Sequence, residues 1–236
     1  MSKEPFNRET ESYYSINSWT KDNPGLVAGI TTRWGGVSTE PFQSLNMGLH
    51  VGDDESSVVR NRQLLASSLM MPVESWAAAE QTHGNNIHKV GEVDKGKGSE
   101  YYHTSIKDTD GFITRDENIL LTMCYADCVP LYFLDKVSGT IGLAHAGWKG
   151  TVSQIGPKMV DAYMEKGTSM SSLEVVIGPS ICKNCYVVDD YVIDKVKKTL
   201  EDENNLPYNL KEEGQYYLDL KKLNEQLLVQ TGLNAE

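Results

Sequence analysis

Short apolar blocks separated by glycine, proline and charged residues recur along most of the chain. Runs of this length and composition, bounded by turn residues, are typical of buried strands. We expect strands over residues 26–32, 75–90, 110–114, 119–126, 131–135, 140–147 and 173–179. Most of these blocks follow one another without a helix between them, so parallel βαβ repeats are not the organising unit.

Longer segments with apolar residues on one helical face predict the helices. Residues 52–72 begin with Asp and Ser and end at Pro72, as a capped helix does. Residues 149–167 predict a second helix, which loses regularity near Pro157. Two further helices are expected at about 189–201 and 218–231. The combination predicts an α+β fold with a mixed sheet and one domain over residues 1–236.

Composition narrows the class of protein. The 236 residues contain 39% hydrophobic and 23% charged residues, which is typical of a globular protein. A formal net charge of -11 argues against a nucleic-acid partner. The first thirty residues have no apolar signal-peptide core, and no run of eighteen apolar residues occurs. We therefore expect a cytoplasmic protein that binds neither membrane nor nucleic acid, with an oligomeric state left open.

Three of the predicted strands share one unusual feature. Each ends in a side chain that binds metals or acts as a nucleophile, with a glycine or proline within two positions: His83, Cys128 and His145. One such residue alone is more typical of a packed or hydrogen-bonded side chain. Its repetition at three strand ends favours a shared site.

Two imidazoles and a thiolate form the ligand set of a catalytic zinc site with an open fourth position. The same residues also match the strong ligands of a blue-copper centre, so copper is possible at this site. Two alternatives use the same side chains. One is a metal-free cysteine hydrolase with Cys128 as nucleophile and His145 or His83 as base. The other is a non-catalytic module that a structural zinc stabilises.

The remaining cysteines are Cys124, Cys182 and Cys185. Four cysteines are few for a chain of this size, so free thiols are the expectation. The Cys182–Cys185 pair has CxxC spacing, and a structural zinc held by all four cysteines is one alternative. No βαβ context surrounds the pair, which excludes a thioredoxin-like site. We interpret it as a turn with two thiols.

Seven ordered motifs cover most of residues 26–190: TRWGGVS, SLNMGLHVGDD, QTHG, DTDGF, YADCVPL, AHAGWKG and IGPSI. By these motifs the chain resembles the YfiH-like family, described both as laccase-type polyphenol oxidases and as purine nucleoside phosphorylases with adenosine deaminase activity. The resemblance implies mixed β-sheets layered with helices. It also implies that His83, Cys128 and His145 are the zinc-binding catalytic residues. The implied reactions are phosphorolysis of adenosine, inosine and methylthioadenosine, and deamination of adenosine.

The laccase interpretation conflicts with the histidine count. A multicopper oxidase needs many histidines, usually in His-x-His pairs, whereas this chain has five and no such pair. One mononuclear site is what the sequence can supply. We therefore favour a zinc enzyme over a copper-dependent polyphenol oxidase.

Purine nucleosides and phosphate need further contacts. For phosphate or ribose we expect Arg33 and the backbone amides of Gly150 and Thr151, which open a predicted helix. Asn46 and Gln81 are expected to line the site as polar contacts.

Two residues inside the motifs have open roles. Asp127 is a candidate for orienting a ligand, and Trp148 is a candidate for stacking on the purine or for a place in the core. Family members continue past a helix like the one at 218–231 into a Cys-containing strand and a basic segment. We expect that segment to be lacking here, because the sequence ends at Glu236.

Overall fold

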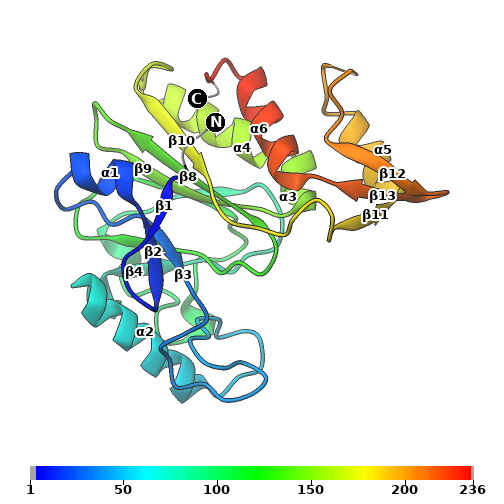
Figure 1. Cartoon of the computed structure of the whole chain (residues 1–236). Helices are drawn as coiled ribbons and strands as arrows, with labels where there is room; N and C mark the ends of the chain where they lie inside the picture. The colour runs from blue at the N-terminus through cyan, green and yellow to red at the C-terminus, as the bar shows by residue number, and fades with distance from the viewer. Residues whose placement is uncertain (1–3, 203, 235–236) are drawn as a thin grey trace. The chain divides into compact units, whose positions relative to one another are not determined.

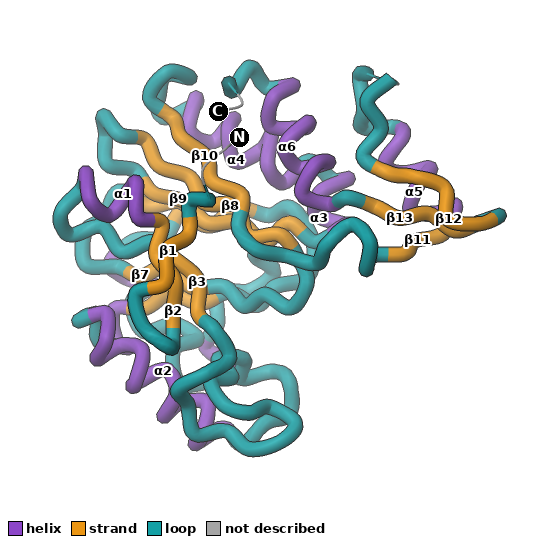
Figure 2. The backbone as a smooth tube through the Cα atoms, in the orientation of Figure 1, coloured by secondary structure: helices purple, strands orange, loops and turns teal. Residues whose placement is uncertain are grey.

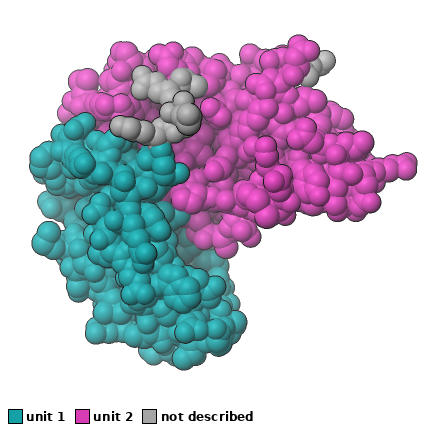
Figure 3. Space-filling model, in the orientation of Figure 1, with its two compact units in different colours: residues 1–78, 91–106, 117–124 teal, residues 79–90, 107–116, 125–236 magenta. Residues whose placement is uncertain are grey.

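The computed structural model describes residues 4–202 and 204–234. The chain divides into two compact units, coloured teal and magenta in Figure 3. Unit 1 comprises residues 1–78, 91–106 and 117–124, and unit 2 comprises residues 79–90, 107–116 and 125–236. Both units combine helices with sheets, so the predicted α+β class is confirmed.

Unit 1 contains two small sheets. Three antiparallel strands form the first, in the order β1 (Phe6–Arg8), β2 (Tyr13–Ile16) and β3 (Gly29–Thr31). A parallel pair forms the second, from β4 (Trp76–Ala78) and β7 (Leu120–Thr122). The helical elements are α1 (Asn17–Asp22), α2 (Glu55–Leu69), η1 (Val73–Ser75), η2 (Glu92–Asp94) and η3 (Tyr102–Thr104).

Helix α2 lies within the range that the capping signals predict. The Asp54 side chain accepts a hydrogen bond from the Ser57 amide at 2.8 Å, which caps the N-terminus. At the other end Met70 takes a left-handed conformation, and Pro72 follows. The buried face of the helix, with Leu65 and Ala66, packs with Val73 and Trp76 in a separate small core.

Unit 2 is built on a five-stranded sheet of order β10-β8-β9-β6-β5 (Figures 1 and 2). Its strands are β5 (Ile87–Lys89), β6 (Gly111–Thr114), β8 (Val129–Asp135), β9 (Ile141–Ala146) and β10 (Leu173–Ile177). All neighbours are antiparallel except β5 and β6. Every residue of β8 is buried, which explains why this strand is an almost continuous apolar run.

A helical layer packs on this sheet. It consists of α3 (Trp148–Val152), α4 (Ile155–Met164) and α6 (Leu220–Gln230), and α4 contacts both β9 and α6. Beside α6 lies a second sheet of order β11-β13-β12, with helix α5 (Asp190–Lys197) packed against it (Figure 1). Its strands are β11 (Val187–Asp189), β12 (Tyr208–Glu212) and β13 (Gln215–Leu218).

Two predicted elements differ from the structure. The helix over 149–167 breaks at Gln154, which has a φ of 67°, and not at Pro157. Pro157 is the third residue of α4, where a missing N–H leaves no helical hydrogen bond unmade. The strand expected over 75–90 is two short strands, β4 and β5, and the loop between them contains His83. None of the helices in the described ranges combines the length and apolarity that crossing a bilayer requires.

Asp135 ends β8 and gives the fold a pH-dependent contact. Its buried carboxylate, 2% exposed, accepts hydrogen bonds from the Val137 amide and from the hydroxyls of Ser138 and Thr168. Burial alone would raise the pKa of Asp135, but these hydrogen bonds outweigh it and lower the pKa to about 2.

We predict that Asp135→Asn lowers the free energy of unfolding by about 2 kcal/mol at pH 7, because the folded-state pKa lies below the unfolded-state value. This contribution is complete above about pH 4 and is lost as the pH falls through about 2. Urea unfolding at several pH values measures it, with exposed Asp161→Asn as the control. An equal loss at all pH values would contradict the role of the charge.

Candidate metal centre

Strand register brings three of the predicted residues together in unit 2. Cys128 immediately precedes β8, and the β8–β9 pairing places Pro130 opposite His145. His83 comes from the loop before β5. One ligand atom from each of His83, Cys128 and His145 lies within 4.8 Å of the others. The three predicted residues therefore lie together, but only His145 lies near the end of a strand: Cys128 precedes β8, because the strand expected over 119–126 is the shorter β7, and His83 lies in a loop.

Asp110 is the buried acid that organises this cluster. It directly precedes β6, and the pairing of β6 with β9 places its carboxylate beside His145. Asp110 Oδ1 lies 2.8 Å from His145 Nδ1, and the Asp110 carbonyl accepts the His145 amide at 2.8 Å. This contact fixes the imidazole and leaves Nε2 as the nitrogen available to a metal.

The same carboxylate holds the loop of His83. It accepts hydrogen bonds from the amides of Thr82, His83 and Gly84 at 3.1, 3.1 and 2.7 Å. His83 has a φ of 61°, a region that side chains other than glycine seldom adopt. The three amide contacts stabilise this conformation, so Asp110 positions both histidines.

Gly147 permits the close packing of the cluster. A Cβ atom at this position would lie 3.0 Å from Cys128 Sγ and 3.0 Å from His83 Cδ2. Both atoms belong to side chains of the cluster, so any larger residue would displace a candidate ligand. A side chain at the glycine of the AHAGW motif would therefore require Cys128 and His83 to shift.

The protonation of the cluster follows from these contacts. Burial alone would lower the pKa of His145, but hydrogen bonds with Asp110 and Cys128 outweigh it and raise the pKa to about 9. The pKa of His83 is lowered, first by burial and then by the positive charges of His145 and Lys149. Burial would raise the pKa of Asp110, yet its hydrogen bonds with His145 and Gly84 lower it. His145 thus holds a proton at neutral pH, which a metal ion would displace.

The donor set fits a metal ion. Among the residues with described positions, His83, Cys128 and His145 form a group whose ligand atoms face one another closely enough to share an ion. The group ranges from exposed His83 through half-buried Cys128 to His145, which is 3% exposed. A ligand could therefore approach from the side of His83.

Three other predicted site residues do not belong to the group of His83, Cys128 and His145. Arg33 lies in unit 1, where its Nε and one terminal nitrogen donate to the Gln43 carbonyl at 2.9 and 2.7 Å. Asn46, also in unit 1, donates to the Asp53 carboxylate at 2.9 Å. Gln81 is half-buried in the same loop as His83. Their roles as substrate contacts stay predictions.

The backbone amides of Gly150 and Thr151, expected to contact phosphate or ribose, lie within the short helix α3, and this role stays a prediction. Helix α3 begins at Trp148, and the Thr151 amide donates to the Gly147 carbonyl at 2.8 Å. The Thr151 hydroxyl is buried and bonds with Asn224 at 3.0 Å. Gly150 is also buried, and a Cβ there would lie 2.7 Å from the Gly84 carbonyl. Thr151 and Gly150 therefore pack helix α3 against Asn224 and against the Gly84 backbone.

Asp127 differs from its candidate role, whereas Trp148 takes one of its two candidate roles, a place at the core. Asp127 is exposed and its carbonyl accepts the Ile181 amide, whereas Asp110 orients the cluster. Trp148 packs against the main core and meets Tyr191 edge-on, with ring centroids 6.2 Å apart. Sequence reasoning missed Asp110 as a functional residue, although an acid directly before an apolar strand was visible in DTDGF.

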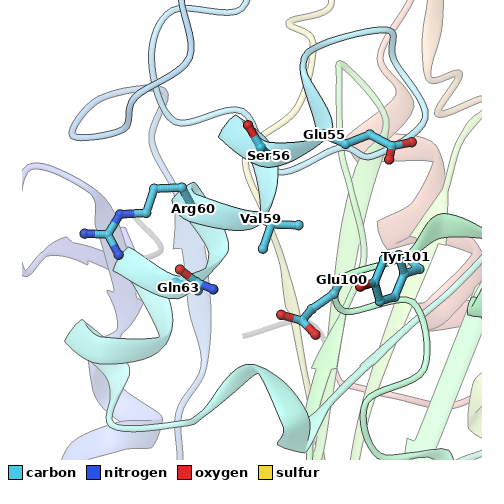
Figure 4. Close-up of a pocket in the computed structure, with 7 residues that line it drawn as sticks. All are labelled: Glu55, Ser56, Val59, Arg60, Gln63, Glu100 and Tyr101. Carbon is cyan, nitrogen blue, oxygen red and sulfur yellow. The ribbon is translucent and has the colours of Figure 1, made fainter.

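A separate hollow of about 520 Å³ lies in unit 1. Figure 4 shows its lining, to which α2 and a loop with Glu100 and Tyr101 contribute side chains. The lining residues are Glu55, Ser56, Val59, Arg60, Gln63, Glu100 and Tyr101. They include no residue of the cluster, so the hollow adds nothing to the metal site.

Comparison with known proteins places the chain in a family. A family model described as "Multi-copper polyphenol oxidoreductase laccase" matches residues 27–236. Purine nucleoside phosphorylase YlmD of Bacillus subtilis is 47% identical over 236 residues, covering 98% of this chain and 84% of that protein. Its namesake in Geobacillus stearothermophilus is 46% identical over 210 residues, covering 89% and 77%.

Solved structures agree with this placement. The crystal structure of Bacillus licheniformis hypothetical protein YfiH has a TM-score of 0.94 and 42% identity, covering 98% of this chain and 86% of that one. YlmD from Geobacillus stearothermophilus gives a TM-score of 0.93 with the same identity and coverage. The resemblance that the sequence motifs indicate is therefore confirmed.

We predict that Asp110→Asn lowers the affinity of the cluster for Zn²⁺ or Co²⁺ by about 10- to 100-fold, the range typical when a ligand loses its hydrogen-bonded carboxylate. Isothermal titration with each ion measures the change. Asp108→Asn is the matched control, because Asp108 bonds with Thr82 and Asn86 in the same region. Equal affinities in the parent protein and Asp110→Asn would contradict the positioning role.

Proposed function

The chain belongs to the YfiH family, whose model is described as multi-copper polyphenol oxidoreductase laccase, and we propose that it is a zinc-dependent purine nucleoside phosphorylase. The observation that carries the proposal is the His83–Cys128–His145 cluster with its buried carboxylate. Relatives named purine nucleoside phosphorylase, at 46–47% identity, supply the reaction class. Adenosine, inosine and methylthioadenosine are the proposed substrates, with deamination of adenosine as a second activity.

The ligand count favours one metal over a multicopper centre. The chain has five histidines, and the described residues bring two of them into the cluster with Cys128. Three protein ligands and an open position are typical of catalytic zinc. A copper ion also suits imidazole and thiolate ligands, so weak oxidase activity with bound copper is a second candidate.

The two reactions require different bonds to change. In phosphorolysis a phosphate oxygen attacks C1′ of the ribose, the bond from C1′ to the purine breaks, and the base leaves with a proton. In deamination, water replaces the amino group at C6 and ammonia departs. A bound metal would supply Lewis-acid polarisation of a substrate atom or of water.

The residues of the chain supply position and charge. His83 and Cys128 form the accessible side of the cluster, where substrate would enter. Asp110 holds His83 and His145 in place, which keeps the cluster rigid while the substrate changes. Lys149 supplies a positive charge that acts on His83, and we assign it to the phosphate.

A metal-free cysteine hydrolase remains the other candidate, and one observation favours it. Cys128 contacts His145, and His145 contacts Asp110, which is the order of a nucleophile, an imidazole that pairs with its thiolate and an orienting acid. Nothing in this order requires His83. The two candidates therefore differ in the need for a metal and for His83.

Metal removal separates these candidates. We predict that dialysis against a chelator abolishes phosphorolysis of adenosine and that Zn²⁺ restores it. Cys128→Ser should lower kcat/KM by more than about 100-fold. Loss of a residue that only hydrogen-bonds to a metal ligand typically costs about 10- to 100-fold, and Cys128 is proposed to be a ligand itself. Release of adenine and ribose 1-phosphate measures the activity, with exposed Cys182→Ser as the thiol control. Chelator-insensitive release of adenine without ribose 1-phosphate, retained in His83→Ala, would support the hydrolase instead.

Lys149→Met tests the phosphate contact. We predict that it raises the KM for phosphate by about tenfold, equivalent to 1.4 kcal/mol, because a favourable charge is lost. The KM for the nucleoside should change much less, and added salt should narrow the difference between variant and parent. Lys158→Met, on an exposed position of α4, is the control. Equal KM values for phosphate would refute the assignment.

A further inference from the structure

Two exposed thiols lie outside the metal cluster, in the loop between β10 and β11. Cys182 and Cys185 flank a tight turn, in which the Cys185 amide donates to the Cys182 carbonyl at 2.9 Å. The turn brings their Sγ atoms to 2.8 Å, and both are free thiols. Neither belongs to the His83–Cys128–His145 group.

The backbone geometry of this turn suits a disulfide. The first and fourth residues of a β-turn have Cα atoms closer than about 7 Å. Disulfides usually join Cα atoms about 4.4 to 6.8 Å apart. The two side chains already point toward each other, so a disulfide needs little movement of the backbone.

The segments on both sides of the turn are anchored. On one side the Ile181 amide donates to the Asp127 carbonyl at 3.0 Å. On the other side the Leu218 amide donates to the Tyr186 carbonyl at 3.0 Å. These contacts hold the thiols near each other, which raises the effective concentration of one at the other.

The two thiols are not equivalent. The hydrogen bond between them lowers the pKa of Cys182 and raises the pKa of Cys185. Because the thiolate is the reactive form, Cys182 is the better nucleophile. The buried thiol of Cys124 contrasts with both, since burial raises its pKa.

We propose that Cys182 and Cys185 form a reversible dithiol–disulfide couple whose oxidant is a small-molecule disulfide such as glutathione disulfide. The Cys182 thiolate attacks one sulfur of the oxidant, forming a mixed disulfide and releasing one small thiolate. Cys185 then attacks Cys182 Sγ and releases the second. Two electrons and two protons leave the cysteines, one protein disulfide forms, and two small thiols are produced.

Lys183 lies between the two cysteines and gives a direct test. The full chain is equilibrated with glutathione disulfide, its remaining thiols are alkylated, and it is denatured and digested with trypsin. Cleavage after Lys183 puts the cysteines on separate peptides. We expect these peptides to stay joined after oxidation and to separate after reduction, as mass spectrometry shows.

Single variants assign the order of attack. Cys185→Ser should accumulate a mixed disulfide with glutathione at Cys182, because the second attack is lost. Cys182→Ser should form the corresponding adduct at Cys185 more slowly. Both substitutions are at exposed positions, and circular dichroism checks that the variants fold.

Three results would overturn the proposal. The first is a pair that stays reduced in excess glutathione disulfide. The second is a disulfide that joins either cysteine to Cys124 or Cys128. The third is equal rates of adduct formation in the two variants, which would remove the assignment of Cys182 as nucleophile. None of these measurements depends on phosphorylase activity.

Discussion

The carboxylate of Asp110 is the contact on which the candidate site depends. A buried acid with 0% exposure is costly unless its oxygens are hydrogen-bonded. Here the donors are the imidazole of His145, the amides of Thr82–Gly84 and the Thr82 hydroxyl. The groups that stabilise the buried Asp110 carboxylate are therefore His145 itself and the loop that carries His83. The same hydrogen bonds stabilise the acid and position both histidines.

That coupling originates in the central sheet of unit 2. The pairings β8–β9 and β9–β6 place Cys128, His145 and Asp110 at neighbouring strand ends. A slip of one residue in either pairing would turn these side chains to the opposite face. The sheet is fully buried along β8, which fixes this register through the core.

The chemistry of the cysteines depends on their surroundings. Burial raises the pKa of the Cys124 thiol, whereas Cys128 lies in the cluster with His83 and His145. Cys182 and Cys185 are exposed on a turn where each affects the pKa of the other. Cysteine thus occupies a half-buried position, the candidate metal cluster and a proposed redox couple in a single chain.

Sequence alone determined the α+β class, helix α2 with its caps and the three members of the cluster. These features follow from local periodicity, capping and the repeated polar ending of apolar strands. Tertiary structure decided that Asp110 and not Asp127 positions the histidines, and that Thr151 is used in packing. Both outcomes depend on strand register and helix packing between segments distant in the chain, which local sequence does not encode.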